Sequence, residues 1–269
     1  MKKAVLVVLV FIIMQVVVPI VTTYILGAYG MSFGGVDKVS GQIYNPYVLS
    51  GMMLAVYALT VGALYSWRLL SPRAGLVRRK TVLPLAVAIL VLALVPMSYV
   101  EELLDLSDSL GGSMELLMHN PLGIFCVAVV GPVVEELVFR RAFLGSLLEG
   151  KVKAVVAVPI TALVFGLVHF NPAQIPAAFV IGTLLGWLYV RTGSIIPSVV
   201  CHVVNNSLCV VVALCAPKNA TFSLLVGGTV NAVAIAVAAA VIVALLIRIY
   251  NRKTAASAEP AHEILHDEN

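Results

Sequence analysis

Apolar runs of roughly 20 residues, the length that an α-helix needs to cross a bilayer, recur along this chain between short polar loops. Composition agrees, because 61% of the 269 residues are hydrophobic and only 11% are charged. A soluble domain has about 25% charged residues. The runs cover approximately residues 4–26, 46–70, 81–100, a fourth from 121 onward, 152–170, 173–190, 194–215 and 222–249.

These runs predict an all-α, polytopic membrane helix bundle of about eight transmembrane helices, with both termini on the same side. Lys2 and Lys3 precede the first run, as in a signal peptide. However, that run is longer than the usual apolar core of about 7–15 residues, so we expect a retained span rather than a cleaved one.

The basic residues predict the orientation of the bundle. Eight spans place 15 of the 17 Lys and Arg residues on one side and only Lys38 and Lys218 on the other. Cytoplasmic loops carry the excess of basic residues. We therefore predict a multi-pass protein of the cell membrane with a cytoplasmic N-terminus and C-terminus. Because the basic charge is divided between loops in this way, it does not indicate nucleic-acid binding.

The runs divide the chain into four parts. Residues 1–120 form a three-helix region with an acidic external loop, 121–215 a core of four membrane helices, 216–250 the last span and 251–269 a polar cytoplasmic tail. The tail contains His262-Glu263-Ile264-Leu265-His266, a literal H-E-x-x-H zinc pattern. No third ligand or packed element lies nearby in sequence, so we expect a chance match and a dispensable tail.

Three polar clusters lie within the predicted spans, where ionisable residues are costly and usually functional. The first contains Glu135, Glu136 and Arg140. Successive helical residues point about 100° apart, so the two acids face different directions. Glu136 and Arg140 are four residues apart and can form a pair along one face. That leaves Glu135 as the candidate base.

The other two clusters each place two polar or aromatic side chains one helical turn apart. Phe165 and His169 form one, and His202 and Asn206 form the other. Taken singly, each has a structural interpretation, because histidine and asparagine often form hydrogen bonds between membrane helices. Taken together, a base candidate, two imidazoles and an amide are a set of groups suited to hydrolysis.

The three clusters, in this order and spacing, resemble the motifs of the CAAX prenyl protease and bacteriocin-processing family (CPBP, also called Abi). The matching patterns are Glu135-Glu136-x-x-x-Arg140, Phe165-x-x-x-His169 and His202-x-x-x-Asn206. The resemblance covers about residues 121–215, which would then be the catalytic core. It implies an intramembrane endopeptidase that cleaves a membrane-anchored protein or peptide, in CAAX-type or leader-peptide processing.

The resemblance also implies residue roles. A water activated by Glu135 and positioned with the help of His169 would attack a peptide carbonyl, and His202 with Asn206 would stabilise the oxyanion. The implied catalytic residues are Glu135, His169, His202 and Asn206. The implied supporting residues are Glu136, Arg140 and Phe165.

The need for a metal remains open at this point, because the family has been described both as metal-dependent and as glutamate-dependent. If a metal is used, Glu135, His169 and His202 could form a zinc-ligand set. We favour a mechanism without a cofactor, because the amide of Asn206 beside His202 is an unlikely zinc ligand.

Other functions also fit the residues. A non-catalytic membrane scaffold or a bacteriocin self-immunity protein could keep the same fold. A proton-coupled transporter could use the acids as a relay, although we find no clear inverted repeat. The sequence predicts neither the oligomeric state nor the identity of the substrate.

The depths of the clusters in the membrane conflict if all spans are straight. Glu135 and His202 would lie roughly 9–12 Å from the cytosolic side, and His169 roughly 24 Å from it. The clusters can meet only if the fourth helix extends past the membrane and the fifth begins in the cytosol, or if both tilt.

Overall fold

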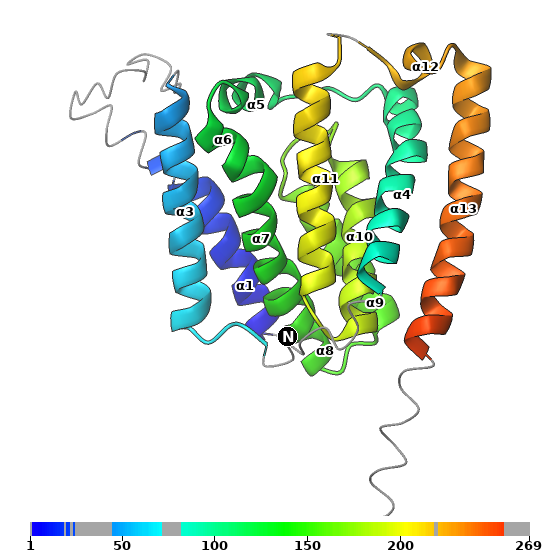
Figure 1. Cartoon of the computed structure of the whole chain (residues 1–269). Coiled ribbons are helices and arrows are strands. Elements are labelled where there is room, and N and C mark those ends of the chain that lie inside the picture. Colours follow the sequence, from blue (N-terminus) through cyan, green and yellow to red (C-terminus); the bar gives the residue numbers. More distant parts are fainter. Residues whose placement is uncertain are drawn as a thin grey trace, which may run out of the picture.

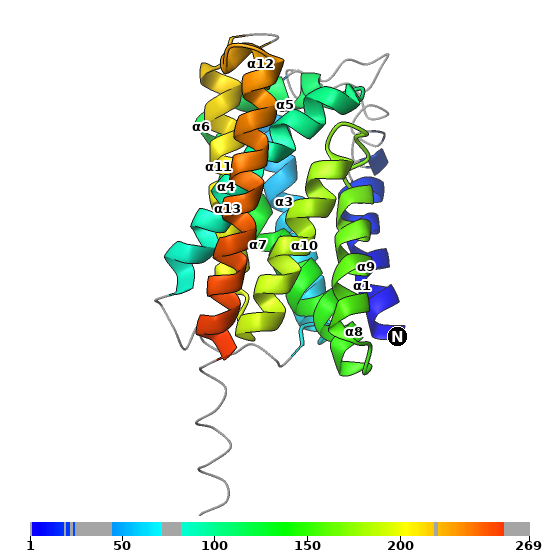
Figure 2. The same cartoon turned by 90° about the vertical axis from the view of Figure 1, so that its right-hand side faces the viewer.

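The computed structural model describes residues 2–18, 20–21, 24, 45–71, 82–217 and 220–255, and every regular element in these ranges is helical. The helices run up and down one bundle (Figure 1). A view turned by 90° places α9 and α1 on one side of it and α13 on the other (Figure 2). The α-helices and π-helical segments (η) are α1 Lys2–Ile12, η1 Ile13–Val17, α3 Pro46–Ser66, α4 Leu83–Leu104, α5 Gly111–Met118, α6 Pro121–Phe125, η3 Cys126–Val130, α7 Gly131–Glu136, η4 Leu137–Leu144, α8 Gly145–Glu149, α9 Ala154–Leu167, α10 Ile175–Thr192, α11 Ile196–Cys215, α12 Phe222–Leu225 and α13 Thr229–Ala255.

Six helices in the described ranges are long and apolar enough to cross a membrane, which confirms the all-α membrane bundle. They are Pro46–Ser66, Leu83–Leu104, Pro121–Glu149, Ile175–Thr192, Ile196–Cys215 and Thr229–Thr254. The first predicted run is helical through α1 and η1, and its remainder lies mostly outside the described residues. The fifth is the apolar helix α9, which has 14 residues. The count of eight spans therefore remains a prediction.

Reporter fusions test the predicted topology. The N-terminal end of the chain and the end of α13 lie at the same end of the bundle (Figure 1). Because the basic loops predict that this end is cytoplasmic, reporters fused at Asn269 and Gly75 should read as cytoplasmic, and one inserted at Gly112 as external. An external signal from the fusion at Asn269 would rule out this orientation.

Asparagine-proline pairs set the start of two spans. The Asn45 side chain accepts hydrogen bonds from the backbone N–H groups of Tyr47 and Val48 before α3. Asn120 accepts from Gly123 N at 2.7 Å before α6. In both helices the next residue is proline, whose missing N–H costs nothing in the first turn.

Two predicted elements have different bounds in the structure. The last run, expected as one span over 222–249, is divided into α12 and α13, because Gly227 and Gly228 between them adopt positive φ angles of 83° and 117°. The fifth, expected over 152–170, ends at Leu167, and Phe170 has a φ of 51°. The region predicted as an acidic external loop contains a further helix, α5, which begins at Gly111.

The helical segment Pro121–Glu149 runs through the bundle and is half buried along its most apolar window. It contains Pro132, which has no N–H for the helical ladder. The structure widens the helix into π turns on both sides, at η3 and η4. Such turns often occur at functional sites. In this helix they flank α7, which carries Glu135 and Glu136.

Candidate active site

The two adjacent glutamates of α7 have different environments. Glu136 is completely buried, and its Oε2 lies 3.0 Å from Nε of Arg140, which confirms the pair that the spacing of four residues predicts. Its other oxygen, Oε1, lies 2.9 Å from Nδ1 of His202 on α11. Both oxygens of Glu136 are therefore in contact with a basic side chain.

Glu135 is the more available of the two carboxylates. Its side chain is 19% exposed, and Oε2 lies 3.7 Å from Nε2 of His202. This oxygen is buried and has no hydrogen-bond partner among the residues that the structure describes. A separation of 3.7 Å is too long for a hydrogen bond but within the distance of an ion-pair contact. His202 thus presents one ring nitrogen to each glutamate.

Arg140 is held in the interior from three sides. Its side chain is 1% exposed and pairs with Glu136, while Nη2 donates to the carbonyl oxygen of Gly182 on α10 at 3.3 Å. The guanidinium carbon lies 5.0 Å from the ring centroid of Phe165, a favourable cation–π distance. A Cβ atom at Gly182 would come within 3.0 Å of the Phe165 ring, so glycine allows α9 and α10 to approach here.

Phe165 lies between the two histidines. It is 2% exposed, and its ring makes edge-to-face contacts with His169 at 4.9 Å and His202 at 5.6 Å between centroids. Phe139 makes a similar contact at 5.0 Å. These contacts show that the second and third clusters meet at Phe165.

The depth conflict is resolved by the position of the turn between the fourth helix and α9, the fifth run. The segment Pro121–Glu149 is 29 residues long, and α9 starts only after it, at Ala154. The helix α8 therefore lies at the same end of the bundle as the N-terminus (Figures 1 and 2). The fourth helix continues beyond the motif before the chain turns back, so Phe165 reaches the level of His202.

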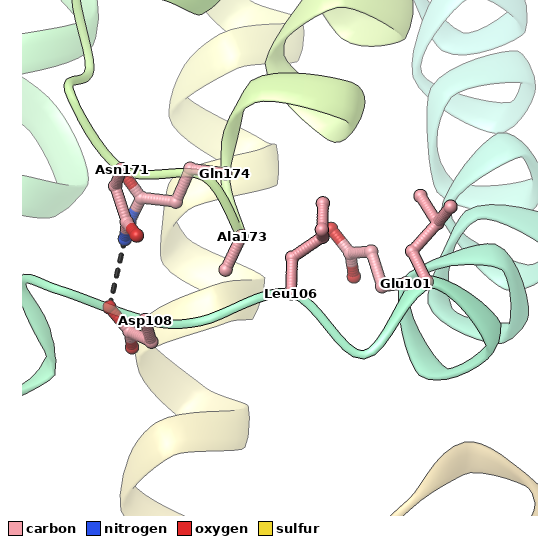
Figure 3. Close-up of a pocket in the computed structure, with 7 residues that line it drawn as sticks. Glu101, Leu106, Asp108, Asn171, Ala173 and Gln174 are labelled. Carbon is pink, nitrogen blue, oxygen red and sulfur yellow. Dashed lines mark hydrogen bonds between the residues drawn. The ribbon is translucent and has the colours of Figure 1, made fainter.

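His169 follows the last turn of α9, where its Nδ1 lies 2.7 Å from the carbonyl oxygen of Phe165. The loop after it is attached to the segment that follows α4. Asn171 is completely buried, donates to Asp108 at 2.8 Å and accepts from Ser109 N at 3.2 Å. Figure 3 shows Asn171 and Asp108 meeting at a cavity of about 250 Å³. Sequence analysis missed this anchor, because 63 residues separate its two partners.

The two asparagines of α11 form a pair. Asn206 donates from Nδ2 to the carbonyl oxygen of Val127 at 3.0 Å, and its Oδ1 accepts from Asn205 at 2.9 Å. The Oδ1 atom of Asn205 is buried and has no partner in the described parts of the chain. The π turn η3 contains Val127, so Asn206 links α11 to the helix that carries the glutamates.

The possible zinc-ligand set of Glu135, His169 and His202 does not assemble. Across the described ranges, no three His, Cys, Asp or Glu side chains lie together as metal ligands. His202 directs Nδ1 to Glu136 and His169 directs Nδ1 to a backbone carbonyl, which leaves Nε2 of each ring as the nitrogen that could face a metal. Because no third ligand lies together with them in the described ranges, these side chains do not fit a three-ligand zinc centre as they are arranged. The tail histidines His262 and His266 lie outside the described residues.

The acidic pair Glu101-Glu102 at the end of α4 lies away from these glutamates. Glu101 lines the cavity of Figure 3 together with Asp108 and Asn171. Glu102 accepts hydrogen bonds from the backbone N–H and the hydroxyl of Ser223, at the start of α12. The solvated acidic surface expected here thus includes a carboxylate that stabilises a helix start.

Comparison with known proteins identifies relatives of this region. Residues 118–208 match the family described as type II CAAX prenyl endopeptidase Rce1-like. The chain is similar to the membrane-embedded CAAX protease MroQ of Staphylococcus aureus (strain USA300), with 31% identity over 103 residues, 36% of this chain and 42% of MroQ. It is also similar to YdiL of Bacillus subtilis (strain 168), a candidate membrane peptidase by its name, with 28% identity over 113 residues, 42% of this chain and 46% of YdiL.

Each similarity covers less than half of the relative's length. No solved structure matches the chain. The family match contains the three polar clusters, from Glu135 in the first to Asn206 in the third. Residues 118–208 of this chain are therefore similar to the Rce1-like family of type II CAAX prenyl endopeptidases.

Proposed function

We propose that this protein is an intramembrane endopeptidase that hydrolyses a peptide bond of a membrane-anchored protein or peptide. The observation that carries the proposal is the state of the two glutamates. Glu136 contacts Arg140 at 3.0 Å and His202 at 2.9 Å, whereas the buried Oε2 of Glu135 has no hydrogen bond in the described residues and lies 3.7 Å from His202. A general base needs such an available acceptor.

The proposed reaction begins with a water molecule beside Glu135. Oε2 of Glu135 takes a proton from this water as its oxygen forms a bond to the carbonyl carbon of the substrate. The carbonyl oxygen becomes an oxyanion, for which we propose two donors: the second N–H of the Asn206 amide and the Nε2–H of the doubly protonated His202 ring, whose Nδ1–H stays with Glu136. Collapse of the intermediate breaks the C–N bond, and the proton held by Glu135 passes to the leaving amine.

The other side chains of the site have supporting roles in this proposal. Glu136 holds His202 through Nδ1, so that Nε2 faces Glu135. Arg140 balances the charge of Glu136 and makes a cation–π contact with the Phe165 ring. His169, on the other side of Phe165, would help to place the water or the substrate.

A cleavage assay tests this function. Protein purified in detergent would be incubated with lipid-modified peptides that end in a CAAX sequence, and separately with leader peptides, with the products measured by mass spectrometry. The wild type should cleave one class, and Glu135→Gln should not. The matched control is Glu101→Gln, which changes a carboxylate away from the site. If a cellular phenotype survives Glu135→Gln and no peptide is cleaved, a scaffold or self-immunity role replaces this proposal.

A chelator separates the two mechanisms proposed for the family. Because no three-ligand group forms within the described residues, we expect the cleavage rate to be unchanged by a chelator of divalent metals. Truncation after Ala255, which removes the H-E-x-x-H of the tail, should also leave the rate unchanged. Loss of activity with chelator and its return with zinc would contradict the metal-free mechanism.

A further inference from the structure

Tyr57 of α3 points at the helix that carries the proposed base. Its side chain is only 8% exposed, and a Cβ atom at Gly131 would lie 2.9 Å from the tyrosine hydroxyl. Gly131 precedes Glu135 by four residues and so lies one turn away on the same face of the segment. The tyrosine hydroxyl therefore faces the helical turn next to the one that carries Glu135.

The hydroxyl of Tyr57 and Oε2 of Glu135 are two polar groups on facing helices, and neither has a hydrogen bond within the described ranges. Of the two, Oε2 of Glu135 is a buried atom, for which a missing hydrogen bond is costly, and its contact with His202 at 3.7 Å is too long to supply one. The simplest way to satisfy both groups is to pair them, directly or through one water molecule.

The other polar side chains near Glu135 already have contacts of their own. Arg140 from η4 lies against Glu136, and His202 from α11 directs Nδ1 to the same carboxylate. Cys126, from η3, has its sulfur near the backbone oxygen of Ser50. Tyr57 is thus the hydroxyl donor that α3 brings to Glu135.

We propose that Tyr57 is a positioning residue whose hydroxyl donates a hydrogen bond to Glu135 and holds Oε2 towards the reacting water. The inference rests on the proposed function and adds to it a residue from outside the matched region 118–208. Gly131 is part of the arrangement, because a side chain there would occupy the space next to the hydroxyl.

Tyr57→Phe tests the role, because it removes the hydroxyl and keeps the ring. We expect kcat to fall by about 10- to 100-fold, the range for loss of one hydrogen bond to a charged group, with KM and the thermal unfolding temperature unchanged. The matched control is Tyr65→Phe, which changes a 78% exposed tyrosine of the same helix. A ring that only fills space would leave kcat of Tyr57→Phe at the wild-type value, and that result would overturn the proposal.

A double-mutant cycle with Gly131→Ala gives a second measurement. The added methyl group should displace the hydroxyl and lower kcat in the wild-type background. In the Tyr57→Phe background the same change should cost less, so that the combined loss is smaller than the product of the two separate losses. If the two losses simply multiply, the contact between Tyr57 and the Gly131 turn has no part in turnover.

Glu135→Gln, measured alongside, separates this inference from the function on which it rests. If Glu135→Gln is inactive while Tyr57→Phe behaves like Tyr65→Phe, only the role of Tyr57 is wrong. If Glu135→Gln cleaves at the wild-type rate, or if the wild type cleaves neither peptide class, the proposed function fails and the role of Tyr57 fails with it.

Discussion

Glu135→Gln is expected to reduce peptide cleavage by about 10²- to 10⁴-fold, the usual contribution of a general base. The amide keeps the size of the side chain but cannot accept a proton at neutral pH. The effect on stability should be small, because the side chain is 19% exposed and its Oε2 has no hydrogen bond within the described residues. Cleavage rate and thermal unfolding in detergent would be measured on the same preparation.

The control for this experiment is Glu101→Gln, which should cleave at the wild-type rate. A Glu135→Gln variant that unfolds at a much lower temperature would show that Glu135 has a structural role. A variant that keeps the wild-type rate would exclude both the metal-free mechanism and a zinc mechanism with Glu135 as ligand.

Glu136→Gln changes the residue next to Glu135, but we expect its main effect to be on the stability of the fold and not on the chemical step. Arg140 is 1% exposed, and its Nη1 atom has no hydrogen bond in the described ranges, so loss of the facing carboxylate leaves a buried charge without its partner. Breaking a buried pair in this way typically costs about 3–5 kcal/mol. The unfolding temperature in detergent should fall clearly, whereas that of Glu135→Gln should not.

The double variant Glu136→Gln with Arg140→Gln distinguishes an unpaired charge from a packing defect. Both charges are then absent, so much of the lost stability should return. Turnover should not return, because His202 still lacks the carboxylate at Nδ1 that directs Nε2 towards Glu135. Equal stability of wild type and Glu136→Gln would contradict a stabilising role for the ion pair.

The sequence alone was sufficient wherever the relevant interaction is local. The all-α membrane bundle follows from apolar runs that span a bilayer. The starts of α3 and α6 follow from Asn-Pro pairs at 45–46 and 120–121. The pair between Glu136 and Arg140 follows from a spacing of one helical turn. Each of these depends on residues a few positions apart, whose relative geometry an α-helix determines.

Errors in the sequence analysis lie where the backbone leaves that regular geometry. The last run was predicted as a single helix, because its apolar character continues through Gly227 and Gly228, yet these glycines take positive φ angles and separate α12 from α13. The depths of His169 and His202 conflict only for straight spans. Of the two arrangements that the sequence allows, an extended fourth helix is the one that the 29-residue segment Pro121–Glu149 fits.

The sequence by itself determined that the chain is a helical membrane protein and which side chains are candidates for its chemistry. Only the tertiary structure decided which of these side chains contact one another and which stay available. His202 meets Glu136 across 66 residues, Asn171 meets Asp108 across 63, and Tyr57 comes to Gly131 from another helix. Such contacts depend on how helices pack against one another, which the spacing of residues along a single helix does not specify. Packing therefore leaves Glu135 available and buries Glu136 in its ion pair, a distinction between adjacent identical residues that no local pattern contains.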